Sequence, residues 1–236
     1  PQAAFVVGNN PQGVAFDGAN IWVANQNSNN VTKLRASDGA NLGTFAVGVL
    51  PRFVAFDGAN IWVTNENSRT VTKLRASDGV NLGSFPVGIS PSGIAFDGAN
   101  IWVANSNNSN VMKLRASDGA LLGTFPVGNF PFGIAFDGAN IWVTNTSSNN
   151  VTKLRASDGA NLGSFSVGTL PFGIAFDGAN IWVANRGGNV TKLRALDGAN
   201  LGSFGSGTGP GSSPISIAFD GANVWVANNS SNNITK

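Results

Sequence analysis

The side chains able to do chemistry in this chain are carboxylates, ammonium groups and indoles, and nearly all recur at a fixed spacing. The sequence contains no histidine, cysteine or tyrosine. Histidine is the commonest general base and a common metal ligand, so acid–base catalysis would fall on Asp, Glu or Lys. Glu66 is the only glutamate, whereas the aspartates belong to repeated segments. We therefore predict that the protein is not an enzyme. The first aspartate of each repeat is Asp17, Asp57, Asp97, Asp137, Asp177 or Asp220.

Each of these aspartates opens an Asp-Gly-Ala-Asn turn that could be read as a calcium site. One turn offers one carboxylate and one amide, fewer than the roughly six to eight oxygen ligands that Ca²⁺ takes. Asp and Asn side chains also cap turns by hydrogen bonding to their own backbone. The sequence favours this capping role, and we predict no metal and no cofactor.

The charge balance argues against several partner classes. Lys and Arg number 14 and Asp and Glu 12, for a net charge of +2, and charged residues make up 11% of the chain. The third strand of the first five repeats pairs a Lys with an Arg, such as Lys33 and Arg35, and local ion pairs with nearby aspartates are favoured over a basic outer ring. No nucleic-acid partner is expected. No apolar run reaches the ~18 residues of a membrane span. The low-charge, amide-rich composition favours an extracytoplasmic bacterial protein, periplasmic or secreted.

The spacing of the repeats predicts the architecture. The phrase Ala-Phe-Asp-Gly-Ala-Asn-Ile-Trp-Val starts at Ala15 and returns every 40 residues to Ala175, then at Ala218 with Val224 in place of Ile. A period near 40 is typical of stacked-repeat folds, because one unit is too small to bury its own apolar face. The repeats start near Pro11, Pro51, Pro91, Pro131, Pro171 and Pro214.

One repeat contains four strand signals separated by turns. In the second repeat these are residues 53–56, 61–65, 71–75 and 81–87, with Asp-Gly turns after the first and third. Short β-rich segments joined by hairpin turns predict a propeller blade. We therefore expect an all-β, six-bladed β-propeller of four-stranded antiparallel blades, forming a single domain over residues 1–236.

The two ends of the chain predict how the propeller closes. Residues 4–7 match the fourth-strand segment 44–47, and the sixth repeat reaches its third strand at residues 234–236. Residues 1–8 are thus expected to supply the outer strand of the last blade, which removes free strand edges. The segment equivalent to residues 34–43 has no sixth copy, so either that rim is incomplete or residues beyond Lys236 complete it.

The repeat resembles the NHL type of propeller repeat. The third copy carries the resemblance through Pro91, Gly93, Ile94, Ala95, Asp97 and residues 100–105. YVTN-repeat and streptogramin-lyase propellers are similar as well. Such a lyase implies histidine-dependent, metal-assisted chemistry, and this chain has no histidine. A lyase or hydrolase is therefore kept only as a third alternative.

The differences between repeats gather in two places. The second loop of each blade and the connector that enters it vary, whereas the two Asp-Gly turns barely change. In an up-and-down blade the second loop and the connector lie on the same face. Exposed apolar side chains on a rigid face are typical of protein-binding surfaces. The alternative interpretation is that these side chains plug the central channel and are buried. The candidate residues are Leu50, Arg52, Phe53, Phe130, Phe132, Leu170, Phe172 and Arg186.

These observations predict a non-enzymatic binding or scaffold propeller that engages a protein partner, as a subunit of an extracytoplasmic assembly. The alternative is a multivalent carbohydrate-binding propeller whose tryptophans stack on sugars. A tryptophan at the centre of a strand more often belongs to the core between blades, which is the interpretation we favour. The tryptophans are Trp22, Trp62, Trp102, Trp142, Trp182 and Trp225.

Overall fold

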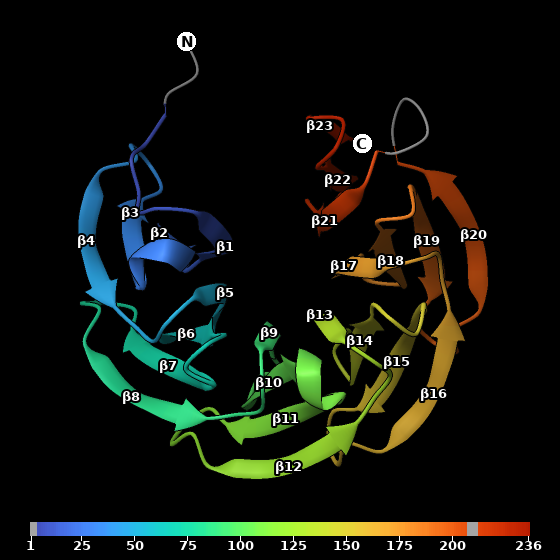
Figure 1. The fold of residues 1–236 in the computed structure, drawn as a ribbon, viewed down its shortest axis with the longest axis horizontal. Coiled ribbons are helices and arrows are strands. Elements are labelled where there is room, and N and C mark those ends of the chain that lie inside the picture. Colours follow the sequence, from blue (N-terminus) through green and yellow to red (C-terminus); the bar gives the residue numbers. More distant parts are fainter. Residues whose placement is uncertain (1–3, 207–211) are drawn as a thin grey trace. The chain divides into compact units, whose positions relative to one another are not determined.

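The computed structural model describes residues 4–206 and 212–236, and within them the fold is a β-propeller with six antiparallel blades (Figure 1). The first five blades have four strands each, and neighbouring strands in the chain are neighbours in the sheet. The predicted fold class is confirmed. The blades of the first half are β1 (Pro11–Phe16), β2 (Asn20–Asn25), β3 (Asn30–Arg35) and β4 (Asn41–Ala46); β5 (Pro51–Phe56), β6 (Asn60–Asn65), β7 (Thr70–Arg75) and β8 (Asn81–Pro86); and β9 (Pro91–Phe96), β10 (Asn100–Asn105), β11 (Asn110–Arg115) and β12 (Leu121–Pro126).

The remaining blades follow the same plan, except that the last sheet has three strands. Short 3₁₀ helices occupy the second loops of the first and third blades, at Gln26–Ser28 and Ser106–Asn108. The strands are β13 (Pro131–Phe136), β14 (Asn140–Asn145), β15 (Asn150–Arg155) and β16 (Asn161–Ser166); β17 (Pro171–Phe176), β18 (Asn180–Asn185), β19 (Asn189–Arg194) and β20 (Asn200–Gly205); and β21 (Pro214–Phe219), β22 (Val224–Asn228) and β23 (Asn233–Thr235).

The three-stranded last sheet is consistent with the predicted closing strand from the N-terminus. Residues 1–3 of that segment lie outside the described part, and residues 4–7 are not assigned to a strand. The ring of Phe5 nevertheless lies against Gly39, in the way that the ring of Phe45 lies against Gly79. Phe5 therefore packs on the first blade as Phe45, from the fourth strand of the first blade, packs on the second blade.

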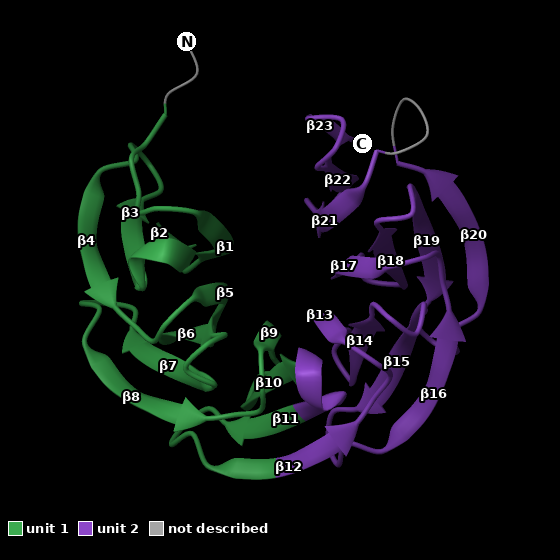
Figure 2. Cartoon of the chain, viewed as in Figure 1, with its two compact units in different colours: residues 1–105, 112–122 green, residues 106–111, 123–236 purple. Residues whose placement is uncertain are grey.

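The chain divides into two compact units (Figure 2). Unit 1 is formed by residues 1–105 and 112–122, and unit 2 by residues 106–111 and 123–236. The third sheet contributes to both units. Within the described residues, no helix is long and apolar enough to cross a membrane.

The core of unit 1 lies between consecutive blades. Trp22 of the first blade is fully buried and belongs to one cluster with Ile61, Leu74 and Ala76 of the second blade. In unit 2, Trp142 packs in the same way with residues of the next blade. In these two pairs, one blade therefore stabilises the other by burying a tryptophan, as a repeat unit without its own core requires.

Backbone hydrogen bonds fix the two edges of each blade. The N–H of Ala36, after the third strand, donates to the carbonyl of Ala19 in the first turn at 3.0 Å. At the opposite edge, the N–H of Glu66 in the second loop donates to the carbonyl of Leu50 in the connector at 2.9 Å. The invariant Asp-Gly turns thus share one edge of the blade, and the variable segments share the other.

Candidate binding surface

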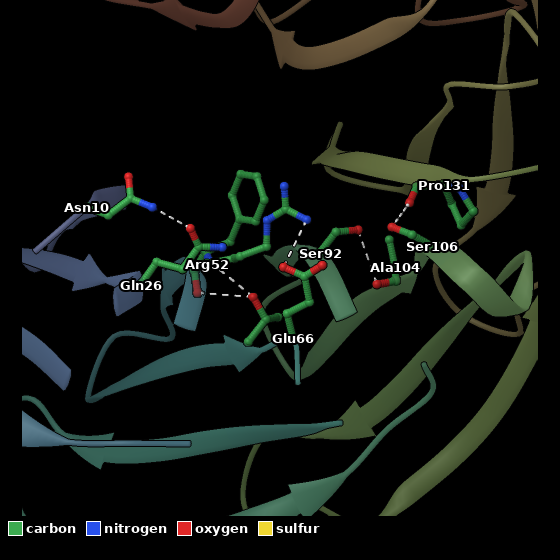
Figure 3. Close-up of polar contacts among 10 residues, drawn as sticks. Asn10, Gln26, Arg52, Glu66, Ser92, Ala104, Ser106 and Pro131 are labelled. Carbon is green, nitrogen blue, oxygen red and sulfur yellow. Dashed lines mark hydrogen bonds and ion pairs between the residues drawn. The ribbon is translucent and has the colours of Figure 1, made fainter. Parts of the chain in front are cut away.

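We call the edge that carries the connectors and second loops the connector face. In unit 1 this face mixes polar side chains with the apolar connector residues Val49 and Ile89, which are 43% and 36% exposed. The amide of Asn10 donates to Gln26 Oε1 at 2.7 Å, and Gln12 Nε2 donates to Asn10 Oδ1 at 3.0 Å. Arg52 and Glu66 form an ion pair at 3.3 Å, with side chains about a quarter exposed (Figure 3). The one unrepeated carboxylate is therefore engaged with Arg52.

In unit 2 the position of Gln12 and Arg52 is aromatic, with Phe132 and Phe172 in consecutive blades. The rings of Phe132 and Phe172 lie 4.2 Å apart between centroids, and the guanidinium of Arg186 lies 4.8 Å from the Phe172 ring. Phe132 is buried, at 7% exposed, whereas Phe172 is half-buried and Arg186 is exposed. The result is a stack in which the cation lies on one ring of a tilted aromatic pair, and this cation–π contact is worth about 0.5–2 kcal/mol depending on solvation.

The connectors of unit 2 also present apolar side chains to solvent. Phe130 is 38% and Leu170 47% exposed, and both have a left-handed backbone with φ of 54°. A residue with a Cβ in this region is strained by roughly 1–2 kcal/mol, and Asn and Gly tolerate it best. The first blade places Asn10, also at φ 54°, in the equivalent position. The apolar residues are therefore the costlier choice for the backbone.

The structure brings three of the predicted residues together and distributes the others. Phe132, Phe172 and Arg186 form the stack, while Arg52 pairs with Glu66, which the sequence reasoning did not assign to the site. Leu50 and Phe53 are half-buried. Glu66 follows Arg52 by fourteen residues, and this spacing is a weak sequence signal, because only the register of the blade makes the two side chains meet.

Hydroxyl groups fasten the connector face to the following blade. In unit 2, Ser106 Oγ donates to the carbonyl of Pro131 and Thr146 Oγ1 to that of Pro171, each at 2.8 Å (Figure 3 shows the first). Both hydroxyls stand at the position that Glu66 and Arg186 occupy in their own blades. Sequence reasoning missed this role because it depends on contacts between repeats.

The opposite edge of the blade uses its carboxylates for structure. Asp57 Oδ1 accepts from the N–H groups of Ala59 and Asn60, and its Oδ2 accepts from Trp62 Nε1 at 2.7 Å. Burial raises the pKa of Asp57, but the hydrogen bonds from Trp62, Ala59 and Asn60 outweigh it and hold the pKa below its usual value. The predicted capping of the turn is confirmed. Within the described residues, no group of three or more His, Cys, Asp or Glu side chains is placed to hold a metal ion.

The lysines of the third strands do not behave as the sequence predicted. Arg35 forms the expected local ion pair with Asp38 at 3.0 Å. Lys33, in contrast, is 6% exposed and donates to the carbonyls of Ala76 and Ser77 in the next blade at 2.7 and 3.0 Å. Its Nζ also lies 5.1 Å from the ring of Trp22. The ion-pair prediction is wrong for Lys33, because buried carbonyls of the neighbouring blade satisfy its ammonium group.

The same packing bears on the tryptophans. Trp22, Trp62, Trp102 and Trp142 are fully buried. A buried indole offers no face to a sugar, so these four are core residues as the favoured interpretation predicted.

Comparison with solved structures supports the fold. A streptogramin B lyase matches with a TM-score of 0.81 at 20% identity, over 98% of this chain and 83% of that one. A protein of unknown function from Desulfotomaculum acetoxidans matches with a TM-score of 0.77 at 21% identity, over 89% of this chain and 72% of that one. The hydrazine synthase of Kuenenia stuttgartiensis matches with a TM-score of 0.65 at 19% identity, over 99% and 97%.

These neighbours are mixed in function, and at such identities the likeness shows the propeller fold alone. No family model matches the sequence. No curated protein matches it either. The resemblance to the NHL repeat therefore remains a prediction.

Proposed function

We propose that this propeller binds a protein partner through the connector face of unit 2, without catalysing a reaction. The observation that carries the proposal is the pair Phe130 and Leu170, which are exposed and apolar on a backbone that favours Asn or Gly. Strained residues that stability does not explain are characteristic of functional sites. The neighbouring Phe132, Phe172 and Arg186 add a rigid aromatic base with an exposed cation.

The chemistry of this surface favours a protein over a small molecule. Aromatic side chains and arginine are the residues enriched at the centres of protein interfaces. The Asp side chains of the turns are held by backbone and indole hydrogen bonds, as in Asp57, which leaves them no acid–base role in the proposal. We further propose an extracytoplasmic location, on the low charge content and abundant amides of the sequence.

The test exploits a substitution that the chain itself offers. Phe130→Asn and Leu170→Asn install the residue found in the first blade at the same φ, so we expect unfolding temperatures equal to or above that of the parent. The matched control is Leu162→Asn in β16, a leucine 40% exposed outside the connector face. Native mass spectrometry of tagged protein from its own source measures the complex.

The expected result is a complex of fixed mass that persists with Leu162→Asn and is lost with Leu170→Asn or Phe130→Asn. A complex that survives both connector substitutions would refute the proposed surface. A chain that is always a lone monomer would refute the proposal of a stable protein partner.

A further inference from the structure

The exposed side chains on the connector face of unit 2 belong to one continuous surface. The carbonyl of Phe130 accepts from the N–H of Thr146 at 3.0 Å, and Thr146 Oγ1 donates to the carbonyl of Pro171 at 2.8 Å. The carbonyl of Leu170, which precedes Pro171, accepts from the N–H of Arg186 at 2.9 Å. These hydrogen bonds connect the backbones of Phe130, Leu170 and Arg186, so a single partner segment can contact all three side chains.

Arg186 gives this surface a positive charge that unit 2 does not neutralise. Its guanidinium lies 4.8 Å from the Phe172 ring, and among the described residues it makes no ion pair or side-chain hydrogen bond. Unit 2 has no glutamate, and each of its aspartates belongs to an Asp-Gly turn at the opposite edge of the blades. Within unit 2, therefore, no carboxylate is available to Arg186 on the connector face. The aspartates are Asp137, Asp158, Asp177, Asp197 and Asp220.

The second blade shows how the chain satisfies an arginine on this face. Glu66 stands at the position of Arg186, since the N–H of each donates to a carbonyl of the preceding connector. The Glu66 carboxylate pairs with Arg52 at 3.3 Å. In the fifth blade Phe172 replaces the arginine and Arg186 replaces the glutamate, so the cation has an aromatic support and lacks the carboxylate. A guanidinium binds a carboxylate through two parallel N–H···O hydrogen bonds, which makes this anion its best-matched partner.

The side chains beside Arg186 determine the rest of the partner's chemistry. Leu170 is 47% and Phe130 38% exposed, and both are apolar. Covering them with apolar side chains removes their surface from water, at about 25 cal/mol per Å². It also lowers the local dielectric around Arg186, which strengthens the interaction of the guanidinium with a carboxylate. The complementary segment therefore carries an acidic side chain with apolar neighbours.

We propose that the connector face of unit 2 recognises an extended acidic–apolar peptide segment of a protein partner. A glutamate carboxylate of the segment binds Arg186, and the flanking apolar side chains cover Leu170 and Phe130. This inference rests on the proposed function and adds the chemistry of the partner. Charge complementarity of this kind selects partners, because a like charge placed against the arginine is repelled.

The experiment uses the whole chain and a labelled peptide with the sequence Leu-Phe-Glu-Leu-Phe, blocked at both ends. Fluorescence anisotropy measures its affinity, together with that of two variants in which Gln or Lys replaces the central Glu. We expect saturable binding of the Glu peptide, binding roughly tenfold weaker for the Gln peptide, and still weaker binding for the Lys peptide. The peptide variants leave the protein unchanged, so they test the recognition of charge without any risk of unfolding.

A charge swap on the protein provides the matched test. Arg186→Glu installs the residue that the second blade carries at this position, and it should make the Lys peptide bind roughly tenfold more tightly than the Glu peptide. The control is Arg194→Glu, which changes the charge equally at the opposite edge, where Arg194 pairs with Asp197 at 2.7 Å. This variant should keep the preference of the parent for the Glu peptide. Circular dichroism checks that both variants are folded.

Three results would overturn the inference: no saturable binding at millimolar peptide, equal affinities for the Glu and Lys peptides, or a parental preference in Arg186→Glu. The complex seen by native mass spectrometry separates this inference from the proposed function. A complex lost with Leu170→Asn and retained with Arg186→Glu would overturn the acidic recognition and leave the proposed surface in place. A complex lost with Arg186→Glu and retained with Arg194→Glu would support the acidic recognition.

Discussion

The sharpest test of the packing between blades compares two lysines at the same position of consecutive blades. Lys153 is 6% exposed, donates to two carbonyls of the fifth blade and lies 4.9 Å from the ring of Trp142. Lys192 has the same contact with its own tryptophan and, among the described residues, no carbonyl partner. Methionine keeps most of the aliphatic stem in both cases, so Lys153→Met and Lys192→Met differ mainly in the hydrogen bonds removed.

The expected magnitudes follow from these contacts. A hydrogen bond to a charged group contributes about 1.5–3 kcal/mol, and Lys153 makes two. Part of this loss is offset, because the variant no longer has to remove an ammonium group from water. The net loss in the free energy of unfolding is about 2–4 kcal/mol. At roughly 2–4 °C per kcal/mol for a chain of this size, Lys153→Met should lower the unfolding temperature by about 4–16 °C. Lys192→Met loses one cation–π contact, about 0.5–1 kcal/mol, or about 1–4 °C.

Scanning calorimetry and urea unfolding followed by circular dichroism measure both variants against the parent. The two lysines lie in unit 2, so the comparison is made within one unit. Equal losses of stability in the two variants would refute the reasoning, because the interblade hydrogen bonds would then contribute nothing beyond the cation–π contact.

Three further predictions address the turns and the connector face. Trp62→Phe removes the donor to Asp57 Oδ2 and should lower the free energy of unfolding by about 1–3 kcal/mol, measured by urea unfolding. The hydrogen bonds that depress the pKa of Asp57 and its counterparts stabilise the fold fully above the unfolded pKa of about 4, and this stability is lost as the pH falls below that value. The unfolding temperature should therefore fall steeply only under acid conditions. A steep fall between pH 5 and 8 would contradict this. A double-mutant cycle on Arg52 and Glu66 should give a coupling energy of about 1 kcal/mol or less, since both side chains reach solvent.

The sequence predicted the blade because its local signals agree with one another. The predicted strands at 61–65 and 71–75 correspond to β6 and β7, and each differs by a single residue at its start. The Asp-Gly pairs marked both turns, since glycine permits the positive φ observed at Gly58 and Gly79. Periodicity, turn chemistry and repetition all pointed to the same answer, which is the condition under which sequence specifies a fold.

The contacts between blades could not be predicted in the same way. Lys33 looked like a partner for a nearby aspartate, yet its acceptors lie 43 and 44 residues away. Likewise, the burial of Phe132 against Phe172 follows from the register of two repeats and from no feature of either alone. Sequence reasoning found which residues vary, but the exposure of each one depends on how consecutive blades pack.

The near-identity of the repeats makes the exceptions informative. Where all six copies keep the same residue, as at the turn aspartates, the structure supplies one set of hydrogen bonds that explains the choice. The connector position at φ near 54° holds Asn10, a half-buried Leu50, Ser90, Phe130 and Leu170 on an almost unchanged backbone. The left-handed backbone conformation at this position is therefore the same from blade to blade, and it favours asparagine. Phe130 and Leu170 depart from that preference toward exposed apolar side chains at a cost to the backbone, and this departure is what supports the proposal of a partner at the connector face.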